Sequence, residues 1–216
     1  LRDVEGERAA LDARLALIAA QGVPNYFGPQ RFGFNNANLG AGEALLADKP
    51  RRRLNNRESI GLSAVRSALF NRVLGERTGS GCWNVCLPGD VLMLDGRNSF
   101  FRPDADDAAL TERLHRQEIH PTGPLFGAGN SPVTGEVLAL EDRIAAETDG
   151  LVERLAAFGI DNQRRALRLH VVDLVSEWLD EGSLRLSFAL PSGAFATSVL
   201  RELVQLRESA DAIPFE

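Results

Sequence analysis

The residue types best suited to chemistry in this sequence lie in the stretch GVPNYFGPQRFG, at residues 22–33. It places three aromatic rings, at Tyr26, Phe27 and Phe32, beside the guanidinium group of Arg31. Such rings stack on splayed RNA bases, and an arginine fork matches a phosphate group. The same pattern also fits a structural role, in which the rings fill a core and Arg31 holds backbone carbonyl groups. From the residues alone, both interpretations stay open.

A second stretch, LPSGAFATSVLREL at residues 190–203, predicts a strand, a turn and then a helix. Backbone N–H groups at a helix start that follows such a turn can receive an anion. The turn contains Gly193, and the helix is expected to begin near Ala196. Phe195 is expected at the sheet edge, where its ring either stacks on a base or packs under the turn.

A third stretch, LSAVRSALFN at residues 62–71, has the apolar spacing of an amphipathic helix, with Arg66 and Asn71 on its polar side. Arginine dominates the cations of the whole chain, because its 24 positive residues include the single lysine Lys49. Arginine suits phosphate recognition, although a genome rich in G and C favours it too. The net charge of −6 argues mildly against a general nucleic-acid binder.

The two cysteines, Cys82 and Cys86, are spaced like half of a metal site. His115 and His120 are the nearest further ligands, and no second pair lies at a suitable distance. We therefore predict two unpaired thiols and no metal. The sequence also shows no apolar run of membrane-spanning length and no signal-peptide pattern, which predicts a protein of the cytoplasm without a membrane partner.

Hydrophobic periodicity predicts the elements that must position these residues, and together they make a mixed α/β chain. Helices are expected at residues 5–20, 59–77 with Ser59 as the N-cap, 106–119, 136–158 with an interruption at Gly150, and 196–206. Strands are expected at residues 90–94, 167–175 and 184–190. Residues 22–40 and 121–135 are rich in glycine and proline and are expected to form loops.

Taken together, the motifs NYFGPQRFG, LSAVRSALFN and PSGAFATSVLREL resemble those of the TruD family of tRNA pseudouridine synthases, in their order and approximate spacing. The resemblance covers essentially the whole chain. It implies an α/β (α+β) fold, in which the antiparallel sheet of the pseudouridine-synthase domain, with flanking helices, is interrupted by an inserted α/β TRUD domain. Residues 22–169 would be this inserted domain, and residues 1–21 and 170–216 would belong to the catalytic domain.

The resemblance further implies an enzyme that isomerises uridine 13 of tRNA to pseudouridine without a cofactor or a metal. The family's catalytic aspartate lies in a Gly-x-Lys-Asp segment. Here Lys49 precedes Pro50, so no Lys-Asp pair exists. We therefore expect the aspartate upstream of residue 1, and we expect this chain to be inactive alone. Residue 1 is Leu and the sole methionine is Met93, which also indicates a missing upstream segment.

By the same resemblance, Phe195 matches the ring that holds the detached uracil. The other predicted substrate-binding residues are Gly193, Arg31, Asn25 and Arg66. Arg31, Arg66, Arg164 and Arg165 are the candidates for contacts to the tRNA backbone. The sequence leaves the oligomeric state and the choice of tRNAs open.

Two other functions are compatible with parts of the sequence. A non-catalytic RNA-binding module would explain the absent aspartate without a missing segment. A hydrolase that uses Glu141 and Asp142 is disfavoured, because adjacent residues on a helix diverge by about 100° and cannot converge on one substrate.

Overall fold

The computed structural model describes residues 1–50, 53–104 and 106–205. Its helices are α1 (Arg8–Gln21), α2 (Ala37–Ala47), α3 (Asn56–Gly79), α4 (Leu110–His115), α5 (Gly135–Ala146), α6 (Leu151–Ala157) and α7 (Ala196–Leu200), and two 3₁₀ turns are η1 (Pro29–Arg31) and η2 (Phe34–Asn36). Its strands are β1 (Val23–Pro24), β2 (Leu92–Leu94), β3 (Phe100–Phe101), β4 (Ile119–Leu125), β5 (Gln163–Ala166), β6 (Arg168–Leu169), β7 (Val172–Trp178) and β8 (Leu184–Ala189).

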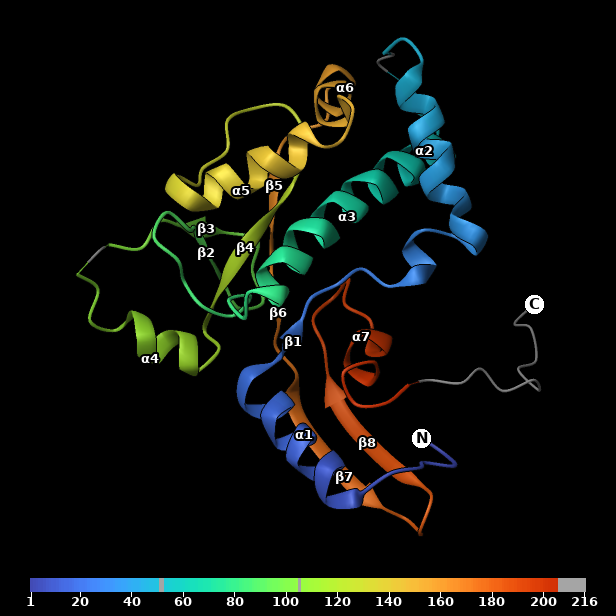
Figure 1. Ribbon diagram of the computed structural model, residues 1–216, viewed down its shortest axis with the longest axis vertical. Coiled ribbons are helices and arrows are strands. Elements are labelled where there is room, and N and C mark those ends of the chain that lie inside the picture. The colour runs from blue at the N-terminus through green and yellow to red at the C-terminus, as the bar shows by residue number, and fades with distance from the viewer. Residues whose placement is uncertain (51–52, 105, 206–216) are drawn as a thin grey trace.

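Figure 1 shows the elements arranged in two parts. The large part contains α2 to α6 and an antiparallel sheet with the strand order β3-β2-β4-β5. The small part contains α1, the antiparallel pair β7–β8, and α7. Between the two parts, β1 pairs with β6, with Val23 opposite Leu169. This pairing brings together the two ends of the segment that forms the large part. The division into an inserted domain at residues 22–169 and a catalytic domain on either side of it stays a prediction.

Strand β4 crosses the middle of the large sheet, so the predicted loop over residues 121–135 is wrong in its first third. Pro121 and Pro124 lack the N–H groups of an ordinary strand, but the Pro121 carbonyl still accepts a hydrogen bond from Leu167 N at 2.8 Å. Gly123 allows β4 to pack closely on α3, since a Cβ there would lie 3.0 Å from the Phe70 ring. The proline and glycine that suggest a loop thus belong to a buried strand.

Helix α3 is the central helix of the large part. Its predicted buried stripe of Leu62, Val65, Leu69 and Val73 is confirmed. The predicted N-cap at Ser59 is wrong, because Asn55 caps the helix: its side chain accepts from Glu58 N while Glu58 accepts from Asn55 N, both at 2.9 Å. This reciprocal pair is a capping box, which satisfies two otherwise unpaired N–H groups.

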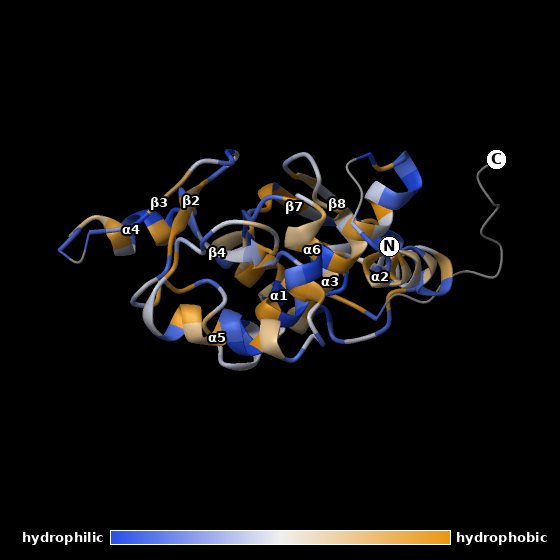
Figure 2. Cartoon of the chain, turned by 90° about the horizontal axis from the view of Figure 1, so that it is seen from above, coloured by the Kyte–Doolittle hydropathy of each residue, from blue (hydrophilic) through white to orange (hydrophobic). Residues whose placement is uncertain are grey.

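The other boundaries differ modestly from the predicted ones. Helix α4 ends at His115, and Ile119 already belongs to β4. The predicted interruption of the helix over 136–158 is confirmed, because α5 and α6 are separated at Gly150, which has a φ of 80°. Helix α5 carries both orange and blue residues in Figure 2, as an amphipathic helix does. The predicted strand at 167–175 is divided between β6 and β7. Helix α7 ends at Leu200, and the predicted end at residue 206 lies outside the described residues.

The small part has a core of its own. Leu11, Leu15 and Ile18 of α1 are buried as predicted, and α1 packs against β7. Strand β8 keeps the predicted alternation, with Leu184 buried and Arg185 exposed. None of the helices in the described part of the chain is long and apolar enough to cross a membrane.

Helices α2 and α3 cross at a contact between two glycines, which generates a stability prediction. A Cβ on Gly42 would lie 2.2 Å from the Gly61 carbonyl oxygen, whereas a Cβ on Gly40 would meet nothing within 4 Å. We expect Gly42→Ala to lower the free energy of unfolding by about 1–3 kcal/mol, because the helices must separate. We expect Gly40→Ala to raise it by about 0.5–1 kcal/mol, because alanine restricts the unfolded chain. Urea denaturation of both variants measures this, and equal effects would contradict the packing.

Candidate functional site

A cleft of about 690 Å³ opens where the two parts meet. Its walls come from the turn between β2 and β3, from strands β5 and β6, and from the turn at residues 191–194. The lining includes the arginines Arg97, Arg164, Arg165 and Arg168. Among the described residues that line the cleft, Asp95 is the single carboxylate. A protein of net charge −6 therefore gathers four arginines and one carboxylate in the lining of this cleft.

Asn25 lies at the base of this cleft and positions a neighbouring arginine. Its side chain is buried, donates to the Ala166 carbonyl at 2.8 Å, and accepts from Nη2 of Arg165 at 2.7 Å. The backbone N–H of Asn25 also donates to the Leu167 carbonyl at 2.8 Å. These bonds attach the start of the NYFGPQRFG motif to the β5–β6 segment. Asn25 thereby links two stretches about 140 positions apart in the sequence.

Arg165 lies over the ring of Phe27, with its Cζ atom 4.1 Å from the ring centroid. Burial, and then the nearby charge of Arg31, lower the pKa of Arg165 to about 10. Its Nε atom is buried and has no acceptor among the described residues. Arg165 is thus held firmly, and most of its donors are unused.

Arg31 approaches the same ring, with its Cζ atom 5.5 Å from the Phe27 centroid. It donates to the hydroxyl groups of Ser63 and Ser67 on α3, and not to the backbone carbonyls that the structural interpretation of this motif would give it. The Phe27 backbone is in turn held by Asn71, which accepts from its N–H and donates to its carbonyl, each at 2.9 Å. The ring of Phe27 is buried and meets Phe70 edge-on at 5.5 Å, so this aromatic fills a core.

Two of the predicted RNA-contacting arginines have their donors occupied inside the fold. Arg66 donates to the backbone carbonyls of Leu125, Phe126 and Asp161, and it is not among the residues that line the cleft. Arg164 is buried, and its Nη1 contacts both carboxylate oxygens of Glu141 at 2.8 and 2.9 Å. The burial of Glu141 adds a second reason against a hydrolase built on that residue.

The turn before α7 brings Gly193 to the cleft but leaves Phe195 beside it. Gly193 has a φ of 83°, and nothing lies within 4 Å of the Cβ that another residue would carry there. Phe195 is half-buried, forms the N-cap position of α7, and is not among the lining residues. Residues 191–194 of this turn therefore line the cleft. Phe195 follows them directly in the sequence but does not itself line the cleft.

A polar network in the cleft wall was not predicted from the sequence. His120 Nε2 lies 2.9 Å from one Asp95 carboxylate oxygen, and His170 Nδ1 lies 3.0 Å from the other. Arg168 Nε donates to His120 Nδ1 at 2.9 Å, so the proton of a neutral His120 sits on Nε2 and points at Asp95. Burial, and then the charge of Arg168, lower the pKa of His120 to about 4. The histidines lie 50 positions apart, and only the fold brings them together.

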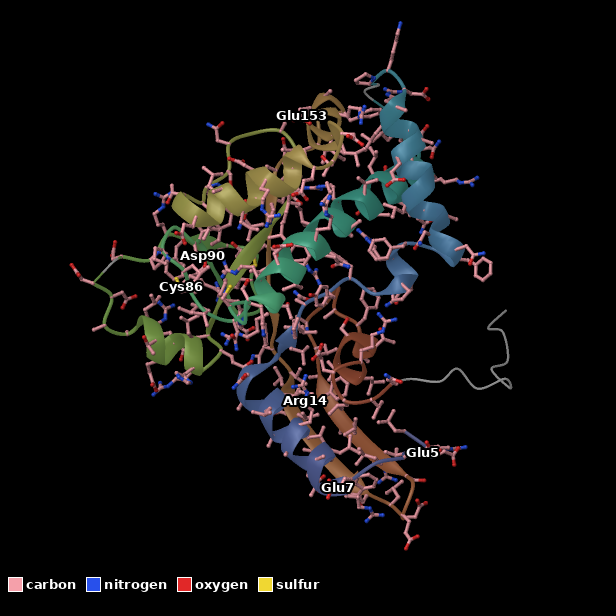
Figure 3. The ribbon with its side chains drawn as sticks, in the orientation of Figure 1. Glu5, Glu7, Arg14, Cys86, Asp90 and Glu153 are labelled. Carbon is pink, nitrogen blue, oxygen red and sulfur yellow. The ribbon has the colours of Figure 1, made fainter. Side chains whose placement is uncertain are left out.

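The predicted thiols lie in the segment between α3 and β2, where Figure 3 labels Cys86 near Asp90. Both cysteines are free and half-buried. Burial and the charge of Asp90 raise the pKa of Cys86. Asp90 itself forms a buried ion pair with Arg77 at 2.9 Å. Within the ranges that the structure describes, no three His, Cys, Asp or Glu side chains gather as metal ligands.

Comparison with known proteins relates this architecture to one family. The family model for tRNA pseudouridine synthase D (TruD) matches residues 52–203. The tRNA pseudouridine synthase D of Xanthomonas campestris is 44% identical over 227 residues, covering 99% of this chain and 62% of that protein. The corresponding protein of Methylococcus capsulatus is 46% identical over 206 residues, covering 95% of this chain and 58% of that protein. The chain thus spans about three fifths of the length of these curated relatives.

A solved structure shares the fold. The crystal structure of a tRNA pseudouridine synthase D from Methanosarcina mazei matches with a TM-score of 0.68 at 19% identity, covering 94% of this chain and 67% of that chain. This likeness, with the helices and antiparallel strands described above, confirms the predicted α/β (α+β) class.

The low pKa of His120 generates a prediction about stability and pH. The unfolded histidine binds a proton near pH 6.5, whereas the folded one does so only at about 4. As the pH falls, the unfolded state therefore binds a proton before the folded state does. Through this group, the free energy of unfolding should fall by about 3 kcal/mol between pH 6.5 and 4. His120→Gln should remove this part of the loss, while His115→Gln, at an exposed position of α4, should keep it. Urea denaturation at pH 7, 5.5 and 4 measures the difference, and parallel losses in all three proteins would contradict it.

Proposed function

Because the chain belongs to the TruD family of tRNA pseudouridine synthases, as the match over residues 52–203 shows, we propose that it serves the isomerisation of uridine 13 of tRNA to pseudouridine. The observation that carries this proposal is the arginine-lined cleft at the junction of the two parts. RNA is a polyanion, and guanidinium groups recognise its phosphates in planar, bidentate geometry.

The exposed arginine of the cleft is Arg97, on the turn between β2 and β3. Its side chain has no ion pair among the described residues, and it lies beside Asn98 and the half-exposed Phe100 in the lining. A turn that presents a cation, an amide and a ring suits single-stranded RNA, whose phosphates and bases are both accessible. In this proposal the turn is the wall that meets the RNA backbone.

The reaction exchanges one bond of uracil for another. The bond between ribose C1′ and uracil N1 breaks, the uracil turns, a bond from C1′ to C5 forms, the C5 proton leaves, and N1 gains a proton. The target base must leave its stack to be reached. In this proposal, the Gly193 turn admits the nucleotide backbone because the space beside it is open, and the Phe195 ring stacks on the uracil at the edge of the cleft.

In this proposal, Asp95 is not the aspartate that attacks the ribose. Both carboxylate oxygens of Asp95 are engaged by histidines at 2.9 and 3.0 Å, and these bonds, which favour the charged form against the effect of burial, lower its pKa. Such a carboxylate orients its neighbours and is poorly placed to attack a sugar carbon. We propose that the aspartate comes from a family segment outside the matched region, upstream of residue 1. The reaction needs tRNA as its partner and no cofactor, and a cytoplasmic site follows from that substrate.

A non-catalytic RNA-binding module is the second candidate, since the basic cleft alone would support it. The two proposals differ in whether tritium is released from C5 of uridine in a tRNA transcript. We expect no release by the chain alone, and release when the part of the Xanthomonas campestris relative that the match leaves out is added. Release by the chain alone would mean that one of its own carboxylates acts. Binding without release in both mixtures would favour the module.

The role of Phe195 has its own test in the active mixture. We expect Phe195→Ala to lower the rate of tritium release by about 5- to 150-fold, because base–aromatic stacking contributes about 1–3 kcal/mol. Phe34→Ala is the matched control, since Phe34 is a ring that is 87% exposed and does not line the cleft. Equal rates for the two variants would remove Phe195 from the site.

A further inference from the structure

Arg165 is half-buried and differs from two buried arginines in what it contacts. Arg77 and Arg164 each face a buried carboxylate, at 2.9 Å from Asp90 and 2.8 Å from Glu141. Arg165, next to Arg164 on β5, makes no ion pair with any described residue. Its side chain makes one hydrogen bond, to Asn25. Since guanidinium has five N–H donors, Arg165 is the least satisfied of these three side chains.

A second positive charge lies close to Arg165 and is also left without a carboxylate. Arg31 approaches the same Phe27 ring and is bonded only to serine hydroxyls among the described residues. Its repulsion is one of the two causes that lower the pKa of Arg165. Two partly buried cations on one ring destabilise each other unless an anion joins them. The fold therefore holds positive charge here that a bound anion would offset.

The direction of Arg165 makes this charge accessible to a ligand. Arg165 is among the residues that line the cleft, as is Asn25, to which its Nη2 donates, whereas Arg31 is not. Stacking on Phe27 at 4.1 Å fixes the plane of its guanidinium group, and Asn25 fixes one edge at 2.7 Å. A preorganised planar fork loses little entropy on binding and matches the oxygens of a phosphate.

We propose that Arg165, backed by the charge of Arg31, forms a phosphate-binding subsite in the cleft that takes one phosphodiester of the RNA substrate. The subsite rests on the proposed function for the identity of its ligand. Arg165 contacts the phosphate directly, while Asn25 and Phe27 position the fork. The neighbouring Arg164 is excluded from this role because Glu141 neutralises it.

The salt dependence of tRNA binding tests the subsite, because each neutralised phosphate contributes a fixed slope. We expect Arg165→Gln to reduce the slope of log K against log salt concentration by about 0.7–0.9, the contribution of one phosphate. Arg165→Lys should keep the slope, because the charge remains, and should bind more weakly, because the fork is lost. Arg143→Gln is the control of equal charge change: Arg143 lies on α5, is exposed, and does not line the cleft. Its slope should equal that of the unmodified chain.

The readout separates this proposal from the proposed function, because binding is measured without any isomerisation. An unchanged slope for Arg165→Gln, with or without weaker binding, overturns the subsite even if pseudouridine forms. A reduced slope supports it even if no pseudouridine forms.

A second measurement avoids dependence on the folding of a variant. Inorganic phosphate, added at constant ionic strength, should shift a guanidinium N–H resonance of Arg165 in ¹H–¹⁵N spectra of the unmodified chain. A single-stranded RNA oligonucleotide should shift the same resonance at a lower phosphate concentration, which identifies the polymer as the source of the anion. A resonance that neither ligand moves overturns the proposal.

Discussion

The buried ion pair between Arg164 and Glu141 is the interaction on which the site depends. It joins β5 to α5 across the core of the large part, with Arg164 also donating to the Thr122 carbonyl at 2.7 Å. Breaking such a pair leaves an uncompensated buried charge, at a cost of about 3–5 kcal/mol. Since side chains alternate along a strand, a shift of β5 by one residue would exchange Arg164 and Arg165. The pair therefore fixes the register that places Arg165 on the Phe27 ring and against Asn25.

The cleft is shaped by bonds that cross between sequence segments far apart. Asn25 binds the β5–β6 segment, and Asp95 joins the turn after β2 to His120 on β4 and to His170 after β6. The hydrogen bonds of Asn25 and those of Asp95 both lie near the pairing of β1 with β6, at the junction of the large and small parts. The same polar groups thus hold the two parts together and line the space between them. Changes in the cleft wall are for this reason expected to affect stability and binding together.

Local sequence signals predicted the elements whose structure is local. The stripe from Leu62 to Val73 specified α3, the alternation from Leu184 specified β8, and Gly150 marked a true break between helices. The signals failed where packing overrides propensity. Strand β4 contains Pro121, Gly123 and Pro124, and it is a strand because its neighbours supply pairing on both sides. The predicted cap Ser59 lies inside α3, and the signal for the true cap is Glu58, three residues after Asn55.

The motifs by themselves determined the family to which this chain belongs and the kinds of group that would meet RNA, because aromatic rings, glycine turns and arginines at those spacings are local properties of the sequence. Tertiary structure alone decided what each group does. Arg164 and Arg165 are adjacent, chemically identical and both part of the cleft wall, yet Glu141 neutralises the first, while the second has no carboxylate partner among the described residues. No sequence pattern connects Asp95, His120 and His170, and they meet only in the fold. The physical reason is that charge, burial and hydrogen bonding depend on distances in space, which contacts between remote segments set.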